Sequence, residues 1–109
     1  MNESRDLAYV EHMLEALDRI DEYVSVGRDE FMSSSLVQDA VIRNLQTMTE
    51  SSQRLSDKIK QRHTDIDWRA MAGFRNILTH DYLGIDLELI WVTIEKELPA
   101  LRRVLLEEK

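Results

Sequence analysis

Residues 4–24 read SRDLAYVEHMLEALDRIDEYV, and their apolar side chains recur at steps of three and four. With about 3.6 residues per turn, such steps place the apolar side chains on one face of an α-helix. We therefore predict an amphipathic helix from about Ser4 to Val24 that ends near Gly27. The residues that define its apolar face are Leu7, Val10, Leu14, Leu17, Ile20 and Val24.

The next segment predicts a second helix, followed by a polar break. Asp29 is an acceptable N-cap, and the apolar spacing continues through Met48. The helix either continues or kinks beyond Met48 to reach Leu55. Residues 56–67, SDKIKQRHTDID, interrupt the pattern and are predicted to be a helix end followed by a loop.

The C-terminal half predicts two more helices. One runs from about Asp67 to His80, with Asp65 or Asp67 as its cap and Gly84 as the break after it. The last runs from about Asp86 to Glu107 and contains Pro99, which removes a backbone hydrogen bond and should bend the helix. The side chains expected to be buried by the first of these helices are Trp68, Met71, Phe74 and Leu78.

Composition supports an all-α fold. The 109 residues include only three glycines and one proline, fewer turn-formers than a protein of many short strands needs. Amphipathic helices with short connections predict an up-and-down four-helix bundle, and one split helix would raise the number to five. The length predicts a single domain over residues 1–109.

Charge and cysteine usage limit the possible functions. The absence of cysteine excludes disulfide and thiolate chemistry and fits a reducing compartment. No apolar run approaches the roughly 20 residues of a membrane span, and the first ten residues lack a signal-peptide pattern. We expect a soluble, cytoplasmic protein without a membrane partner. A net charge of −7 opposes general binding of nucleic acid, so an RNA partner would need a locally positive site.

Residues 73–82, GFRNILTHDY, concentrate polar groups at the end of a predicted helix. Asn76 and His80 share one face, whereas Arg75 and His80 diverge by about 140° on an ideal helix. A histidine at this position can simply cap free carbonyl groups. It can also transfer a proton near neutral pH, while an arginine can hold a phosphate and Asn76 can orient the histidine ring.

These residue types suit RNA cleavage without a metal ion. The reaction needs a base for the 2′-hydroxyl, an acid for the leaving oxygen and a cation for the phosphate. One histidine cannot easily fill both proton-transfer roles. A twofold dimer would supply two copies of His80 and Arg75 in one shared cleft, with additional positive charge from Arg69.

Other candidate residues favour structural roles. His12 and His63 have no spaced acidic or histidine partners, so we predict surface residues and no metal site. Trp68 and Trp91 fall on apolar faces and are predicted to lie in the core. For Tyr82, the role of a packed or hydrogen-bonded side chain remains open as an alternative to a functional role.

The segment RNILTHDY resembles the motif of HEPN domains of the HepT toxin type. The resemblance extends to QDAVIRNLQTMTESSQRLS (38–56), IDWRAMAGFRNILTHDYLGID (66–86) and LIWVTIEKELPAL (89–101). Thr79 and the polar TMTESS run depart from the more apolar residues expected of that family.

The resemblance implies a helical homodimer that acts as a ribonuclease toxin without a metal or other cofactor. It implies catalytic roles for Arg75 and His80, with Asn76 assisting. It further implies a type VII-like pair in which an MntA-type nucleotidyltransferase antitoxin transfers AMP to Tyr82. The alternative is a non-catalytic helical module that binds a nucleotidyltransferase or a nucleotide.

Overall fold

Helices make up most of the described part of the chain, residues 2–80 and 84–109 of a computed structural model. The long helical segments are α1 (Asn2–Val24), α3 (Ser35–Gln53), α5 (Trp68–His80) and the consecutive helices α6 (Leu87–Lys96) and α7 (Leu98–Glu108). Two short helices, α2 (Arg28–Ser33) and α4 (Asp57–Arg62), lie in the connections. The predicted all-α bundle is confirmed; two of its predicted helices are each divided in two, and the short helix α4 is an addition.

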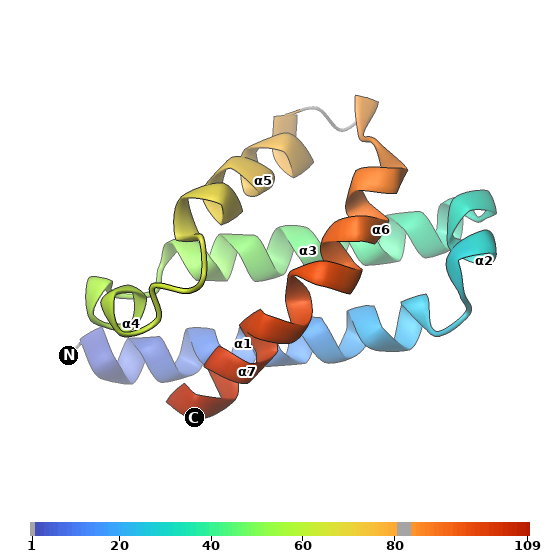
Figure 1. Cartoon of the computed structure of the whole chain (residues 1–109). Coiled ribbons are helices and arrows are strands. Elements are labelled where there is room, and N and C mark those ends of the chain that lie inside the picture. Colours follow the sequence, from blue (N-terminus) through green and yellow to red (C-terminus); the bar gives the residue numbers. More distant parts are fainter. Residues whose placement is uncertain (1, 81–83) are drawn as a thin grey trace.

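The antiparallel pair α1 and α3 forms the base of the bundle (Figure 1). Helix α5 packs on α3, and α7 crosses α1, so that both chain ends lie at the same end of the molecule (Figure 1). Burial of apolar surface between these helices is the main stabilising term. Fully buried side chains include Val10, Met13, Leu17 and Ile20 of α1, Val41, Leu45 and Met48 of α3, and Leu101 and Leu105 of α7.

The predicted N-terminal helix is confirmed, but its buried face is rotated slightly from the predicted one. Helix α1 ends at Val24, and Gly27 follows with a positive φ of 97° that favours glycine. Leu7 is exposed, whereas Met13 and Ala16 are buried. On an ideal helix Met13 lies about 120° and Ala16 about 180° from Leu7, so the buried face is shifted from the predicted one toward Met13 and Ala16.

The second predicted helix is wrong as a continuous element, because it breaks at Ser34. Ser34 has an extended backbone, and its Oγ accepts a hydrogen bond from the Val37 amide at 3.2 Å, which caps α3. The Gln38 amide group donates to the carbonyls of Phe31 and Met32 at 2.9 and 3.1 Å. These side chains satisfy backbone groups on both sides of the break, so the break costs little.

The polar stretch between α3 and α5 contains more order than predicted. Its first half forms the separate helix α4 instead of the end of the preceding helix, and the buried carboxylate of Asp6 accepts hydrogen bonds from the Ser56 amide and hydroxyl. The second half supplies the predicted cap: the Asp67 carboxylate accepts from the Ala70 amide at 2.9 Å. Asp65 instead pairs with Arg103 at 3.1 Å.

The proline in the last helix causes a break rather than the predicted bend. Helix α6 begins after Asp86, whose carboxylate accepts from the amides of Glu88 and Leu89. It ends at Lys96, and Pro99 lies in the first turn of α7, where the amide that proline lacks would have no helical partner. Thus α6 and α7 are separate helices.

His63 is not the surface residue that the sequence predicted. Its Nε2 lies 2.7 Å from Oε2 of Glu108, and the two side chains are only 11% and 13% exposed. Arg62 also donates to Glu108, at 2.6 and 3.0 Å. These contacts tie the end of α4 to the end of α7. Hydrogen bonding from Arg62, and then from His63, lowers the pKa of Glu108 below its ordinary value of 4.5 despite partial burial.

We predict that Glu108 makes the stability of the fold sensitive to acid. Because its pKa is lower in the folded than in the unfolded chain, its contribution is present above pH 4.5 and is lost as the pH falls through the folded pKa. The wild type should therefore lose more unfolding free energy than Glu108→Gln on acidification, as measured by urea titration. The exposed neighbour Glu107 provides the control: Glu107→Gln should behave like the wild type. Equal acid losses in all three proteins would contradict the prediction.

Candidate active site

Helix α5 presents the three predicted site residues in different surroundings. Asn76 and His80 are exposed, whereas Arg75 is half-buried and turns toward α3. No hydrogen bond or ion pair within the described residues joins Arg75 to His80. The structure therefore agrees with the divergence expected of positions five residues apart on one helix.

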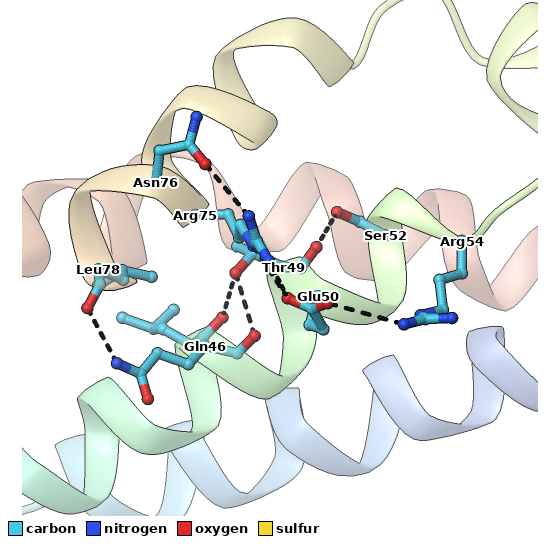
Figure 2. Close-up of polar contacts among 9 residues, drawn as sticks. Gln46, Thr49, Glu50, Ser52, Arg54, Arg75, Asn76 and Leu78 are labelled. Carbon is cyan, nitrogen blue, oxygen red and sulfur yellow. Dashed lines mark hydrogen bonds and ion pairs between the residues drawn. The ribbon is translucent and has the colours of Figure 1, made fainter. Parts of the chain in front are cut away.

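Arg75 is held by Glu50 of α3 (Figure 2). Its Nε and Nη2 both lie 2.9 Å from the same carboxylate oxygen, and its Nη1 donates to Oδ1 of Asn76 at 3.3 Å. Arg54 approaches the other Glu50 oxygen at 3.9 Å. One carboxylate thus lies between two guanidinium groups, and Asn76 orients the arginine rather than the histidine.

The turn of α5 that carries His80 is fixed to α3 by a second contact. Gln46 donates from its side-chain amide to the Leu78 carbonyl at 2.9 Å (Figure 2). The Leu78 side chain beside it is fully buried. Carbonyl groups near a helix end lack helical partners, so a donor from a neighbouring helix both satisfies and positions them. Gln46 therefore sets where the end of α5 lies relative to α3.

A groove of about 420 Å³ lies beside Arg75, between α5, α3 and α1. Arg75 and Thr79 line it from α5, one turn apart. Tyr9 lines it from α1, and the remaining lining residues belong to the polar side of α3: Arg43, Gln46, Thr47, Glu50, Ser51 and Arg54. Three arginines and a single glutamate make this groove locally positive on a protein of net charge −7.

A second pocket of about 560 Å³ opens on the other side of α5, toward α6 and α7. Its lining is largely apolar and includes Phe74 and Ile77 of α5 and Leu89 of α6. Gly73, the first residue of the quoted motif, also lines it. The motif helix thus has a polar groove on the α3 side and an apolar pocket on the α6 side.

The sequence-based analysis missed the residues of α3 that surround Arg75. Arg43, Gln46, Glu50 and Arg54 follow each other at steps of three or four, which is the signature of one helix face. That stripe could have been found as a polar face of the second helix. Its pairing with Arg75 could not, because the pairing depends on how α5 is placed along α3.

Several other predictions concern this region. Tyr82 lies outside the described residues, as do its neighbours Asp81 and Leu83. Trp68 and Trp91 are half-buried and pack against the core, and His12 is exposed as predicted.

Residues 2–80 and 84–109 hold no cluster of three or more His, Cys, Asp or Glu side chains suited to a metal ion. The helices in these ranges are all too short or too polar to span a membrane.

Comparison with known proteins places the chain in a family. Residues 13–107 match the model of the family described as Ribonuclease HepT-like. A Thermococcus cleftensis protein named "Probable ribonuclease HepT" is 34% identical over 95 residues, which are 86% of each chain. A "Putative RNase" of Caldanaerobacter subterraneus subsp. tengcongensis is 30% identical over 96 residues, 87% of this chain and 86% of that protein.

A longer relative contains a comparable segment. The Methanocaldococcus jannaschii protein named "Gamma-glutamylcyclotransferase and putative RNase" is 34% identical over 100 residues, and these make up 91% of this chain but 45% of that protein. No solved structure shows a significant match. The family model covers nearly the whole chain, including the motif and the helices on either side of it. The chain therefore belongs to the HepT-like ribonuclease family, as the resemblance of its motif implied.

Proposed function

We propose that this protein is the ribonuclease toxin of a type VII-like toxin–antitoxin pair. In this proposal residues 1–109 form a single HEPN-like domain that acts in the cytoplasm. The observation that carries it is the position of Arg75, a partly exposed cation in a locally positive groove, five residues before the exposed His80 on the same helix. The family of the chain and the names of its relatives support the choice of RNA as substrate.

The proposed reaction is a transesterification that needs no metal ion. His80 of one chain takes the proton of the RNA 2′-hydroxyl, and the 2′-oxygen attacks the adjacent phosphorus. The bond between phosphorus and the 5′-oxygen breaks, and the protonated His80 of the second chain donates its proton to that oxygen. Arg75 stabilises the charge on the phosphate oxygens, and Asn76 fixes the arginine through its Oδ1. The products are a 2′,3′-cyclic phosphate and a 5′-hydroxyl.

The need for an acid and a base at once leads to a homodimer. Each chain offers one histidine in the motif, so two chains are required for two proton-transfer groups. The apolar pocket beside α5 supports an interface there, because Leu89 in its lining is 43% exposed in the single chain. A second chain packed on this face would cover that surface and bring two copies of the motif together.

We predict that light scattering gives about twice the 12.8 kDa mass of one chain. Leu89→Glu should yield monomers that no longer cut RNA, because it places a charge in the apolar interface. Leu36 is 79% exposed and lies outside the pocket, so Leu36→Glu should stay dimeric and active. A stable monomeric wild type that cuts RNA would rule out the shared site.

We predict that the purified protein cleaves single-stranded RNA in the presence of a metal chelator. His80→Ala should lower the rate by about 10²-fold to 10⁴-fold, and Arg75→Ala by about 10²-fold or more. The exposed His12 gives a matched control, and His12→Ala should retain full activity. Product analysis should find the cyclic phosphate end.

The same variants distinguish the ribonuclease from a non-catalytic binding module. The module needs Arg75 for phosphate binding but no proton carrier. If His80→Ala cuts as fast as the wild type, or if only added divalent ions restore cleavage, the proposed reaction is incorrect. The ion pair lost in Arg75→Ala is the partly exposed Arg75–Glu50 pair. Such pairs contribute about 1 kcal/mol or less to stability, so the variant should remain folded, which circular dichroism can check.

Regulation by a nucleotidyltransferase antitoxin of the MntA type forms the second half of the proposal. The Tyr82 hydroxyl would attack the α-phosphorus of ATP, lose its proton and displace pyrophosphate. The AMP group then adds a negative charge and a bulky base two residues from His80. A phosphate this close to a cationic site competes with RNA for Arg75 and blocks access to His80.

We predict that the partner enzyme with ATP and Mg²⁺ adds one or more AMP units of about 329 Da to this chain and abolishes cleavage. Tyr82→Phe should accept no AMP yet remain a nuclease, since the phenol has no part in the reaction. Tyr23→Phe is the control that should still be modified. Equal modification of the Tyr82→Phe variant, or full activity of modified protein, would contradict this regulatory role.

A further inference from the structure

The groove beside Arg75 continues past the motif along α3. A further pocket of about 300 Å³ is lined by Arg5, Asp6, Tyr9, Arg54 and Ser56. Tyr9 and Arg54 line both hollows, so the two are adjacent, and we refer to them together as a trough between α1 and α3. From Arg43 to Arg54 the trough follows 11 residues of α3, or about 16 Å. It therefore reaches well beyond a single phosphate at Arg75.

The charges along this trough favour a polyanion. Its two carboxylates already have partners inside it: Asp6 accepts from Ser56, and Glu50 lies between Arg75 and Arg54. Arg5 and Arg43 are exposed, and neither forms an ion pair with another described residue. The arginines thus leave a net positive charge in the trough, although the whole chain carries −7. This local positive field attracts phosphate groups, and salt screens the repulsion from the more distant negative charges of the chain.

Tyr9 adds an aromatic surface at the point where the two hollows meet. It is half-buried and packs against the core, so its ring is fixed in place while part of it faces the trough. Proteins that bind single strands combine a positive groove with aromatic rings on which bases stack. The lining of both hollows contains no Leu, Ile, Val, Met, Phe or Trp side chain, so its character is polar and cationic apart from the Tyr9 ring.

We propose that this trough, which we call the arginine groove (Arg5, Tyr9, Arg43 and Arg54), binds the backbone of single-stranded RNA next to the cleaved phosphate, with a base stacked on Tyr9. The inference rests on the proposed function in that it extends the same site. Arg43 and Arg54 contact phosphates without taking part in the chemistry. The groove thereby selects an extended strand over a short one and gives an acidic protein its affinity for RNA.

The test uses a non-cleavable 2′-O-methyl oligonucleotide of roughly 12 nucleotides, a length within the range that such grooves bind. Its Kd is measured by fluorescence anisotropy over a series of salt concentrations. Arg43→Ala/Arg54→Ala should weaken binding by about tenfold or more and reduce the slope of log K against log salt by about 1.4, or about 0.7 per lost phosphate contact. Arg19→Ala/Arg103→Ala, exposed arginines outside the groove with the same charge change, should bind like the wild type.

Tyr9 provides an independent variant. Tyr9→Phe keeps the ring and should bind like the wild type, whereas Tyr9→Leu keeps apolar volume without a stacking surface and should lose about tenfold. Thermal unfolding of both variants separates lost stacking from lost folding. Equal binding by Tyr9→Leu and the wild type would overturn the stacking role.

The outcomes separate this inference from the proposed function. If the arginine-groove variant binds the oligonucleotide like the wild type while the wild type cleaves RNA, the groove is refuted and the nuclease stands. If the groove variant loses binding but the wild type cuts no RNA, the groove is supported and the nuclease is refuted. The groove variant should lose more activity toward a strand of roughly 12 nucleotides than toward a dinucleotide, because only the longer strand spans the groove. Stronger competition by polyglutamate than by an equally charged oligonucleotide would instead indicate an acidic protein partner and overturn the proposal.

Discussion

The packing of α5 on α3 is the contact on which the site depends. Leu78 is buried at this contact, Gln46 holds the carbonyl at the end of α5, and Glu50 holds Arg75. Helix α3 in turn packs along α1, which completes the core. The position of the motif is thus set by rigid helices rather than by a loop, which suits the proposed site, where Arg75 and His80 must be placed reproducibly.

The exposure of the Arg75–Glu50 pair matters as much as its geometry. The two side chains are 32% and 46% exposed, so the pair is neither deeply buried nor free in solvent. A buried pair would cost several kcal/mol to separate, whereas an exposed pair contributes about 1 kcal/mol or less. Arg75 can therefore be oriented by Glu50 in the free protein and, in the proposed reaction, exchange this carboxylate for an RNA phosphate at small cost. An acidic neighbour is in this sense compatible with phosphate binding.

Much of the fold followed from local patterns in the sequence. The apolar steps of α1, the cap at Asp67 and the interruption near Pro99 all depend on residues within one or two turns of each other. The break at Ser34 was missed because Gln38, four residues later, satisfies the carbonyls that the break exposes. The spacing of apolar residues cannot show that a side-chain amide replaces a backbone amide as the donor to these carbonyls.

The contacts between distant segments were beyond prediction for a different reason. Glu108 meets His63, and Glu50 meets Arg75, only because the helices have particular axial shifts and rotations. A shift of one residue along α3 would move Glu50 by about 1.5 Å along the axis and turn it by about 100°. The apolar stripe tolerates such a change in part, because neighbouring apolar residues can replace one another in a core. An ion pair does not.

The arrangement of α5 gives a physical reason for the composition of its motif. Arg75 and Thr79 face the polar groove, and Phe74 and Ile77 face the apolar pocket. A helix with two different partners cannot keep a single apolar stripe, so polar residues necessarily interrupt its pattern. In the proposed dimer, the groove side receives RNA and the pocket side receives the second chain. The divergence of Arg75 and His80 around the helix is then useful, because the two groups act in a cleft bounded by two chains and need not share one face.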